Sequence, residues 1–167
     1  MNFVRTFSAA AIVLITAMFA HASAEERATP TILEFISLWL QSEYQLERPS
    51  SQPGIVTVPS TELLVRRYGE GVIAGSSEVV ALYDAEAEAI LVSDSWTGGS
   101  VAEISVLVHE MVHHLQKEAG MIFACPAERE RLAYRAQDDW LQLFGHDIQS
   151  AFGIDPALIL VATVCTH

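Results

Sequence analysis

The stretch SVAEISVLVHEMVHHLQ, residues 100–116, decides how this chain is interpreted. It opens with Ser100 and Glu103, whose Ser-x-x-Glu spacing is typical of a capping box at the start of a helix. Apolar residues then fill almost every position up to a polar cluster, which indicates a helix packed inside a domain. We therefore expect a buried helix that runs to about Lys117.

The polar cluster contains His109, Glu110 and His113 in the pattern His-Glu-x-x-His. Residues four apart lie on one helical face with Cβ atoms about 5 to 6 Å apart, so both imidazoles can converge on one metal ion. A metal also offsets the cost of burying these polar groups. Glu110 would then act as general base on a water bound to the metal. The alternative is a pair of histidines that only pack and hydrogen-bond.

Catalytic zinc sites usually have three protein ligands, so a further donor has to come from another part of the chain. A second helix, predicted from about Ala127 to Phe144, carries the two candidate carboxylates Glu128 and Glu130.

The residues Glu130-Arg131-Leu132-Ala133 form a Glu-x-x-Ala pattern downstream of the first motif. Together the two patterns resemble the gluzincins, zinc metallopeptidases in which a second helix supplies a glutamate ligand. The resemblance implies one Zn²⁺ per chain, held by His109, His113 and Glu130, with Glu110 as general base. Glu128 fits the spacing less well and is the reserve candidate.

The resemblance covers roughly residues 79–141 and is similar to small secreted bacterial zincin-like proteins. It implies an α+β fold, a minimal zincin-like domain whose β-hairpin or small sheet packs on the active-site helix and on the glutamate-bearing helix. The sequence predicts that hairpin at Val79–Tyr83 and Ala89–Val92. In that fold the strand before the active-site helix is an edge strand, so we expect Ala89–Val92 to pair with an extended peptide substrate.

Three further side chains on the two helices are candidates for supporting roles. Tyr134 stands where several gluzincins have an aspartate, so its hydroxyl could donate to an oxyanion or to the ligand carboxylate, or it could be a plain core residue. Gln116 and Gln137 each return to the ligand-bearing face two turns after a ligand, where the two amides could pair across the helices.

Other polar residues near the motif are assigned with less support from spacing. Asp138 and Asp139 could orient a ligand imidazole. His114 should point about 100° away from His113 and not share its ion.

The first 24 residues have the features of a secretory signal peptide. Arg5 precedes an apolar run at Ala9–Ala20, and Ala22-Ser23-Ala24 has the small-x-small form of a cleavage site. The run is shorter than the about 20 residues that a membrane span needs, which argues against the alternative of an uncleaved anchor. We expect one domain at residues 25–167, in the periplasm or secreted, without stable membrane insertion after cleavage.

The balance of charge argues against nucleic acid as a partner. Removing Arg5 from nine basic residues leaves eight against 21 acidic ones, a formal charge of −13. Phosphate binding needs a basic patch, and none is visible in the sequence. The acidity fits solubility outside the cytoplasm, or attraction of cations and basic substrates.

Cys125 and Cys165 are the only cysteines of the chain. In an exported protein they predict a disulfide, which would stabilise the fold by about 4 kcal/mol on the chain-entropy model. A free or metal-binding thiol pair is the alternative, although C-x-x-C spacing is absent.

The remaining segments predict smaller elements. We expect a helix at about Pro30–Gln45 after an N-cap at Thr29, an extended piece at Ile55–Val58, and a short helix at Ser60–Tyr68. Asp155-Pro156 begins a last helix or a terminal strand.

Three functions are compatible with these patterns. The leading hypothesis is an exported zinc metallopeptidase that hydrolyses peptide bonds with Glu110 as general base. The second is a non-catalytic zinc-containing domain that binds a partner protein. The third is a zinc amidohydrolase acting on a non-peptide bond such as a cell-wall amide.

Overall fold

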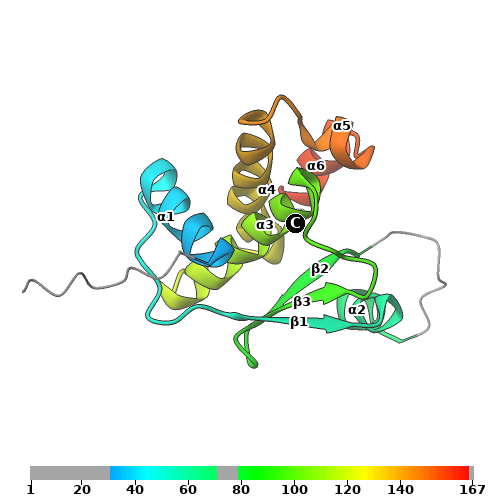
Figure 1. Cartoon of the computed structure of the whole chain (residues 1–167), viewed down its shortest axis with the longest axis horizontal. Coiled ribbons are helices and arrows are strands. Elements are labelled where there is room, and N and C mark those ends of the chain that lie inside the picture. Colours follow the sequence, from blue (N-terminus) through cyan, green and yellow to red (C-terminus); the bar gives the residue numbers. More distant parts are fainter. Residues whose placement is uncertain (1–30, 71–78, 166–167) are drawn as a thin grey trace, which may run out of the picture.

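The computed structural model describes residues 31–70 and 79–165 and has a mixed α+β fold, as predicted (Figure 1). The predicted signal peptide, residues 1–24, lies outside the described residues. The elements are, in chain order, α1 (Ile32–Tyr44), β1 (Gly54–Val58), α2 (Ser60–Tyr68), β2 (Ala81–Asp84), β3 (Ala89–Ser93), α3 (Val101–Glu118), α4 (Pro126–Gln142), α5 (Ile148–Phe152) and α6 (Pro156–Ala162).

Capping boxes fix the starts of helices α1 and α3. In α3 the Glu103 N–H donates to Ser100 Oγ and the Ser100 N–H donates to Glu103 Oε2, each over 3.1 Å, as predicted. Helix α1 begins at Ile32, because Thr31 forms the capping box with Glu34. The N-cap is therefore two residues later than predicted from Thr29.

The sheet has the strand order β1-β3-β2, with β1 parallel and β2 antiparallel to β3. The prediction that Ala89–Val92 is an edge strand is wrong, because β3 lies in the middle and all its residues are buried. The chain passes from β1 through α2 and β2 before it forms β3, which lies between the two earlier strands. Strands β1 and β2 are therefore the outer strands of the described sheet.

Helix α3 occupies the centre of the domain (Figure 1). It packs against α4 over much of its length and also contacts β2 and α1. Leu107, Val108, Met111 and Val112 are fully buried, which explains why the sequence of this helix is apolar on nearly all sides. Residues on this helix are thus held rigidly with respect to both α4 and the sheet.

The C-terminal part of the chain packs on α4. A disulfide between Cys125 and Cys165, as predicted, joins the start of α4 to the residues after α6. Asp155 caps α6, so this segment is a helix rather than a strand. The short helix α5, opened by a capping box of Asp147 and Ser150, was not predicted from the sequence. No helix among the described residues combines the length and apolar character that a membrane crossing requires.

Candidate metal centre

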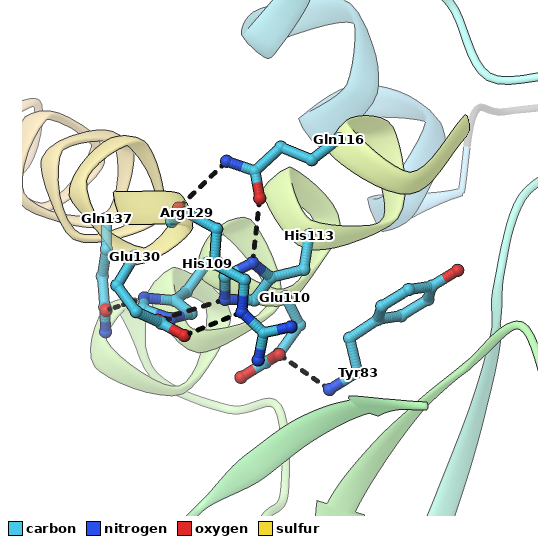
Figure 2. Close-up of polar contacts among 8 residues, drawn as sticks. All are labelled: Tyr83, His109, Glu110, His113, Gln116, Arg129, Glu130 and Gln137. Carbon is cyan, nitrogen blue, oxygen red and sulfur yellow. Dashed lines mark hydrogen bonds and ion pairs between the residues drawn. The ribbon is translucent and has the colours of Figure 1, made fainter. Parts of the chain in front are cut away.

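Three predicted ligand side chains, His109 and His113 of α3 and Glu130 of α4, converge where the two helices pack (Figure 2). Glu130 Oε2 lies 3.2 Å from His109 Nε2 and 3.2 Å from His113 Nε2. The three side chains are 9–11% exposed. The helix-to-helix contact therefore gathers two imidazole nitrogens and one carboxylate oxygen at one buried point.

A glutamine fixes the tautomer of the first imidazole. Gln137 Nε2 donates to Ser105 Oγ, whose own proton goes to the Ala102 carbonyl, so the amide orientation is set. Gln137 Oε1 consequently faces His109 Nδ1 at 3.1 Å and accepts its proton. The lone pair of His109 then lies on Nε2, the atom that faces Glu130.

A second glutamine does the same for the other imidazole. Gln116 Nε2 donates to the Arg129 carbonyl over 2.9 Å, and its Oε1 accepts from His113 Nδ1 over 3.1 Å. The expectation that the two glutamines pair with each other is therefore wrong, because the oxygen of each amide contacts a histidine instead. Both amides lie beside the candidate ligands, but the contacts to the imidazoles were not predicted.

The arrangement fits a bound cation. Two Nε2 lone pairs and a carboxylate oxygen repel one another unless a proton or a metal ion lies between them. The three ligand atoms lie within 4.8 Å of one another, close enough for all of them to bind one ion. These residues could therefore hold a metal ion.

The electrostatics of the cluster follow from the same contacts. Burial raises the pKa of Glu130, but when no metal is bound and both imidazole nitrogens are protonated, hydrogen bonds and charge from His109 and His113 outweigh it and hold that pKa far below its usual range. Burial lowers the pKa of His113, yet the carboxylates of Glu130 and Glu110 bring it above the ordinary value. The carboxylate is thus ionised, which is the form that binds metals.

Glu110, the predicted general base, lies beside the cluster without belonging to it. Its Oε2 accepts a 2.8 Å hydrogen bond from the backbone N–H of Tyr83, and the residue is 6% exposed. The outer strand β2 therefore holds the carboxylate of Glu110 against the cavity, a contact that no local sequence pattern predicted (Figure 2).

Tyr134 packs its ring against a ligand. Its centroid lies 4.7 Å from that of His109 in an edge-to-face arrangement, and its hydroxyl donates to no described residue. Burial and the charge of Glu130 raise the pKa of the phenol, while Arg67 opposes them. The hydroxyl is thus protonated at neutral pH and available as a donor in the cavity.

Three carboxylates considered from the sequence are used elsewhere. Glu128, the reserve ligand, accepts from the Ala124 N–H in the loop before α4. Asp138 accepts from the N–H of Ile148, and Asp139 binds the hydroxyl of Tyr44. The prediction that these aspartates orient an imidazole is wrong, because the glutamines occupy that position.

The cluster opens into a cavity of about 450 Å³. Val80, just before β2, and Tyr83 of β2 line one part of the cavity, and Arg129 and Tyr134 of α4 line another. Two arginines that line the cavity, Arg67 of α2 and Arg129 of α4, were not identified from the sequence. Neither lies in a recognisable motif, and whether they share a cavity depends on how α2 and α4 are placed.

Fold and site thus define a small α+β domain with a buried histidine and glutamate cluster able to hold a metal ion. The chain belongs to the family described as domain of unknown function (DUF6647), whose sequence profile matches residues 24–167. No curated protein and no solved structure matches the chain.

Proposed function

We propose that this protein is an exported zinc metallopeptidase in which His109, His113 and Glu130 bind Zn²⁺ and Glu110 is the general base. The observation that carries the proposal is the convergence of both Nε2 atoms on Glu130 Oε2, with the cavity opening beside Glu110. A metal site of purely structural role would need no carboxylate held next to an open cavity.

Zinc is favoured by the type and spacing of the ligand atoms. Two neutral imidazoles and one carboxylate suit Zn²⁺, whereas Mg²⁺ and Ca²⁺ prefer oxygen ligands only. In a tetrahedral zinc site with bonds of about 2.0–2.1 Å, neighbouring ligand atoms are about 3.3–3.4 Å apart. The 3.2 Å distances from Glu130 Oε2 to the two imidazoles are close to this spacing.

When bound, the zinc ion supplies Lewis acidity that lowers the pKa of a water and polarises a carbonyl. Glu110 takes the proton from the attacking water and later delivers it to the leaving amine. The Tyr83 N–H keeps the Glu110 carboxylate aimed at the cavity, and the Tyr134 hydroxyl is a donor for charge that develops on the substrate oxygen.

The strand beside the site supports a peptide as the substrate class. In an antiparallel ladder, alternate residues direct their backbone groups away from the partner strand. The Val80 carbonyl accepts from Ser93 of β3, and the Tyr83 N–H points instead to Glu110, so the groups of Ala81 also face away from β3. Among the described residues no strand pairs with this edge of β2, which offers hydrogen bonds to an extended peptide that lies across the metal cluster.

The test is a comparison of Glu110→Gln with the wild-type mature chain, with Glu128→Gln as matched control. Metal content is measured by mass spectrometry, and cleavage is measured on peptides and on cell-wall amides. We expect one zinc per chain in all three proteins. A chelator should inhibit peptide cleavage, and added zinc should restore it. The cleavage rate should fall by about 10²–10⁴-fold in Glu110→Gln and stay unchanged in Glu128→Gln.

Four results would contradict the proposal. A wild-type chain that binds no zinc removes the metal centre, and full activity of Glu110→Gln removes the general base. Zinc-dependent cleavage of cell-wall amides without peptide cleavage would assign the same site to an amidohydrolase. Zinc without any cleavage would make the protein a zinc-containing binding domain.

A further inference from the structure

The cavity differs in charge from the rest of the chain. The whole sequence has 21 acidic and nine basic residues, yet the described residues lining the cavity include three basic side chains, Arg67, Lys117 and Arg129, and only two acidic ones, Glu110 and Glu130. A bound divalent metal would raise the positive charge further. The described lining residues thus carry a formal charge of +1, three basic against two acidic, whereas the whole chain carries −12.

The three basic side chains are not equally available to a ligand. Lys117 forms ion pairs with Glu88 and Glu118, so its charge is compensated. Arg67 extends from α2 and lines the cavity together with Tyr134, where its positive charge opposes the rise in the pKa of that phenol. Arg129 forms one ion pair, from Nε to Glu130 Oε1 over 3.3 Å, and its Nη atoms donate to no described residue.

Arg129 is also the basic residue next to the reaction site. Its partner oxygen, Glu130 Oε1, belongs to the carboxylate whose other oxygen faces both imidazoles. Figure 2 shows its side chain extending from α4 toward the side on which Glu110 and Tyr83 lie. The Arg129 side chain is 44% exposed, so a large part of it is open to solvent.

From this placement we infer that Arg129 binds a carboxylate of the substrate adjacent to the bond that is cleaved, so that the cavity selects acidic over neutral peptides. The inference rests on the proposed function. A guanidinium presents a rigid pair of donors that matches the two oxygens of a carboxylate. The carboxylate could be an Asp or Glu side chain or the C-terminus of the peptide, and both present the same pair of oxygens.

A competing explanation is that Arg129 only neutralises Glu130. In that case any cation at position 129 would suffice, and the substrate would gain nothing from its own charge. The variant Arg129→Lys separates the two roles, because it keeps a positive charge beside Glu130 and removes the forked donor pair. Arg135 of α4 lines a different pocket and provides a control of equal charge on the same helix.

The test uses two matched pairs of peptides with the zinc-loaded mature chain. One pair differs by Glu or Gln next to the cleaved bond, and the other by a free or an amidated C-terminus. The measured quantity is the ratio of kcat/KM within each pair, because loss of zinc lowers both members alike. The same pairs are titrated into zinc-loaded Glu110→Gln to measure binding without turnover.

We expect a preference of roughly tenfold or more for the acidic member of one pair, the size of a charge-assisted contact. The ratio should fall to about one in Arg129→Gln, fall partly in Arg129→Lys, and stay unchanged in Arg135→Gln. A preference confined to the first pair identifies a side-chain carboxylate, and one confined to the second identifies a C-terminal carboxylate.

Equal rates within both pairs, or a preference that persists in Arg129→Gln, would overturn the inference while leaving the peptidase intact. If no peptide is cleaved but Glu110→Gln prefers the acidic member and loses this preference on additional Arg129→Gln substitution, the peptidase proposal fails and carboxylate binding by Arg129 stands.

Discussion

His113 and His114 are neighbours on α3 with opposite surroundings. His113 donates from Nδ1 to Gln116 and presents Nε2 to Glu130, in the seam between α3 and α4. His114 is fully buried on the side of the sheet. Its Nε2 donates to the Ser51 carbonyl and its Nδ1 accepts from the Tyr83 hydroxyl, each over 2.9 Å. Both nitrogens of His114 thus have protein partners, and none is left for an ion.

The difference shows that the partners of each ring nitrogen, rather than burial, distinguish a candidate ligand from a structural histidine. His114 nevertheless serves the site indirectly. It holds the side chain of Tyr83, whose backbone N–H holds Glu110. One histidine is thus placed to bind the metal, and its neighbour fixes the wall that positions the general base.

The largest effect is expected from removing His113, the histidine of the pair whose Nε2 faces Glu130. His113→Ala should weaken zinc binding by more than about 100-fold, because loss of an outer partner of a ligand already costs about 10–100-fold. His114→Ala should leave the affinity within a few-fold of wild type. Competition with a chromophoric chelator measures both. A comparable loss in His114→Ala would mean that the two histidines are not distinct in role.

The second prediction concerns stability, for which His114 rather than His113 should matter. His114→Ala should lower the free energy of unfolding of the metal-free protein by about 2–3 kcal/mol, since it leaves a cavity and two unpaired polar groups. Urea denaturation in the presence of a chelator measures it. The exposed His146→Ala is the control and should change stability by less than about 0.5 kcal/mol. An unaltered stability of His114→Ala would remove its assigned role at the sheet.

The smallest effect concerns the glutamine behind the other ligand. Gln137→Leu should weaken zinc binding by about tenfold, because His109 loses the acceptor that keeps its proton on Nδ1. Gln142→Leu, which removes an exposed amide from the same helix, is the control in the same chelator competition. Unchanged affinity in Gln137→Leu would show that the imidazole keeps its tautomer without this contact.

Much of the helical structure and of the candidate metal centre could be predicted because the sequence signals are local. The capping box of Ser100 and Glu103, the i and i+4 histidines, and the Glu-x-x-Ala pattern at Glu130 each lie within one or two helical turns. Helical geometry alone then places His109 and His113 on one face and His114 off it. Even the supporting positions of Gln116 and Gln137 follow from a return to the same face.

Apart from the start of α1 and the missed helix α5, the errors concern contacts between segments distant in the chain. The strand order, which makes β2 rather than β3 the free edge, depends on the crossover through α2. The hydrogen bond from Tyr83 to Glu110 depends on how the hairpin lies over α3. Asp138 and Asp139 were expected to orient an imidazole and Gln137 to pair with Gln116, and only the packing of α4 on α3 decides that Gln137 meets His109.

The sequence by itself determined the helices and the candidate ligands, because a helix repeats every 3.6 residues and fixes its neighbours through short-range geometry. Only the tertiary structure decided which strand borders the cavity, which amide holds each imidazole, and which arginines line the cavity. Those outcomes depend on the packing of α3 against α4 and β2, where side chains far apart in sequence compete for one place and burial selects among them.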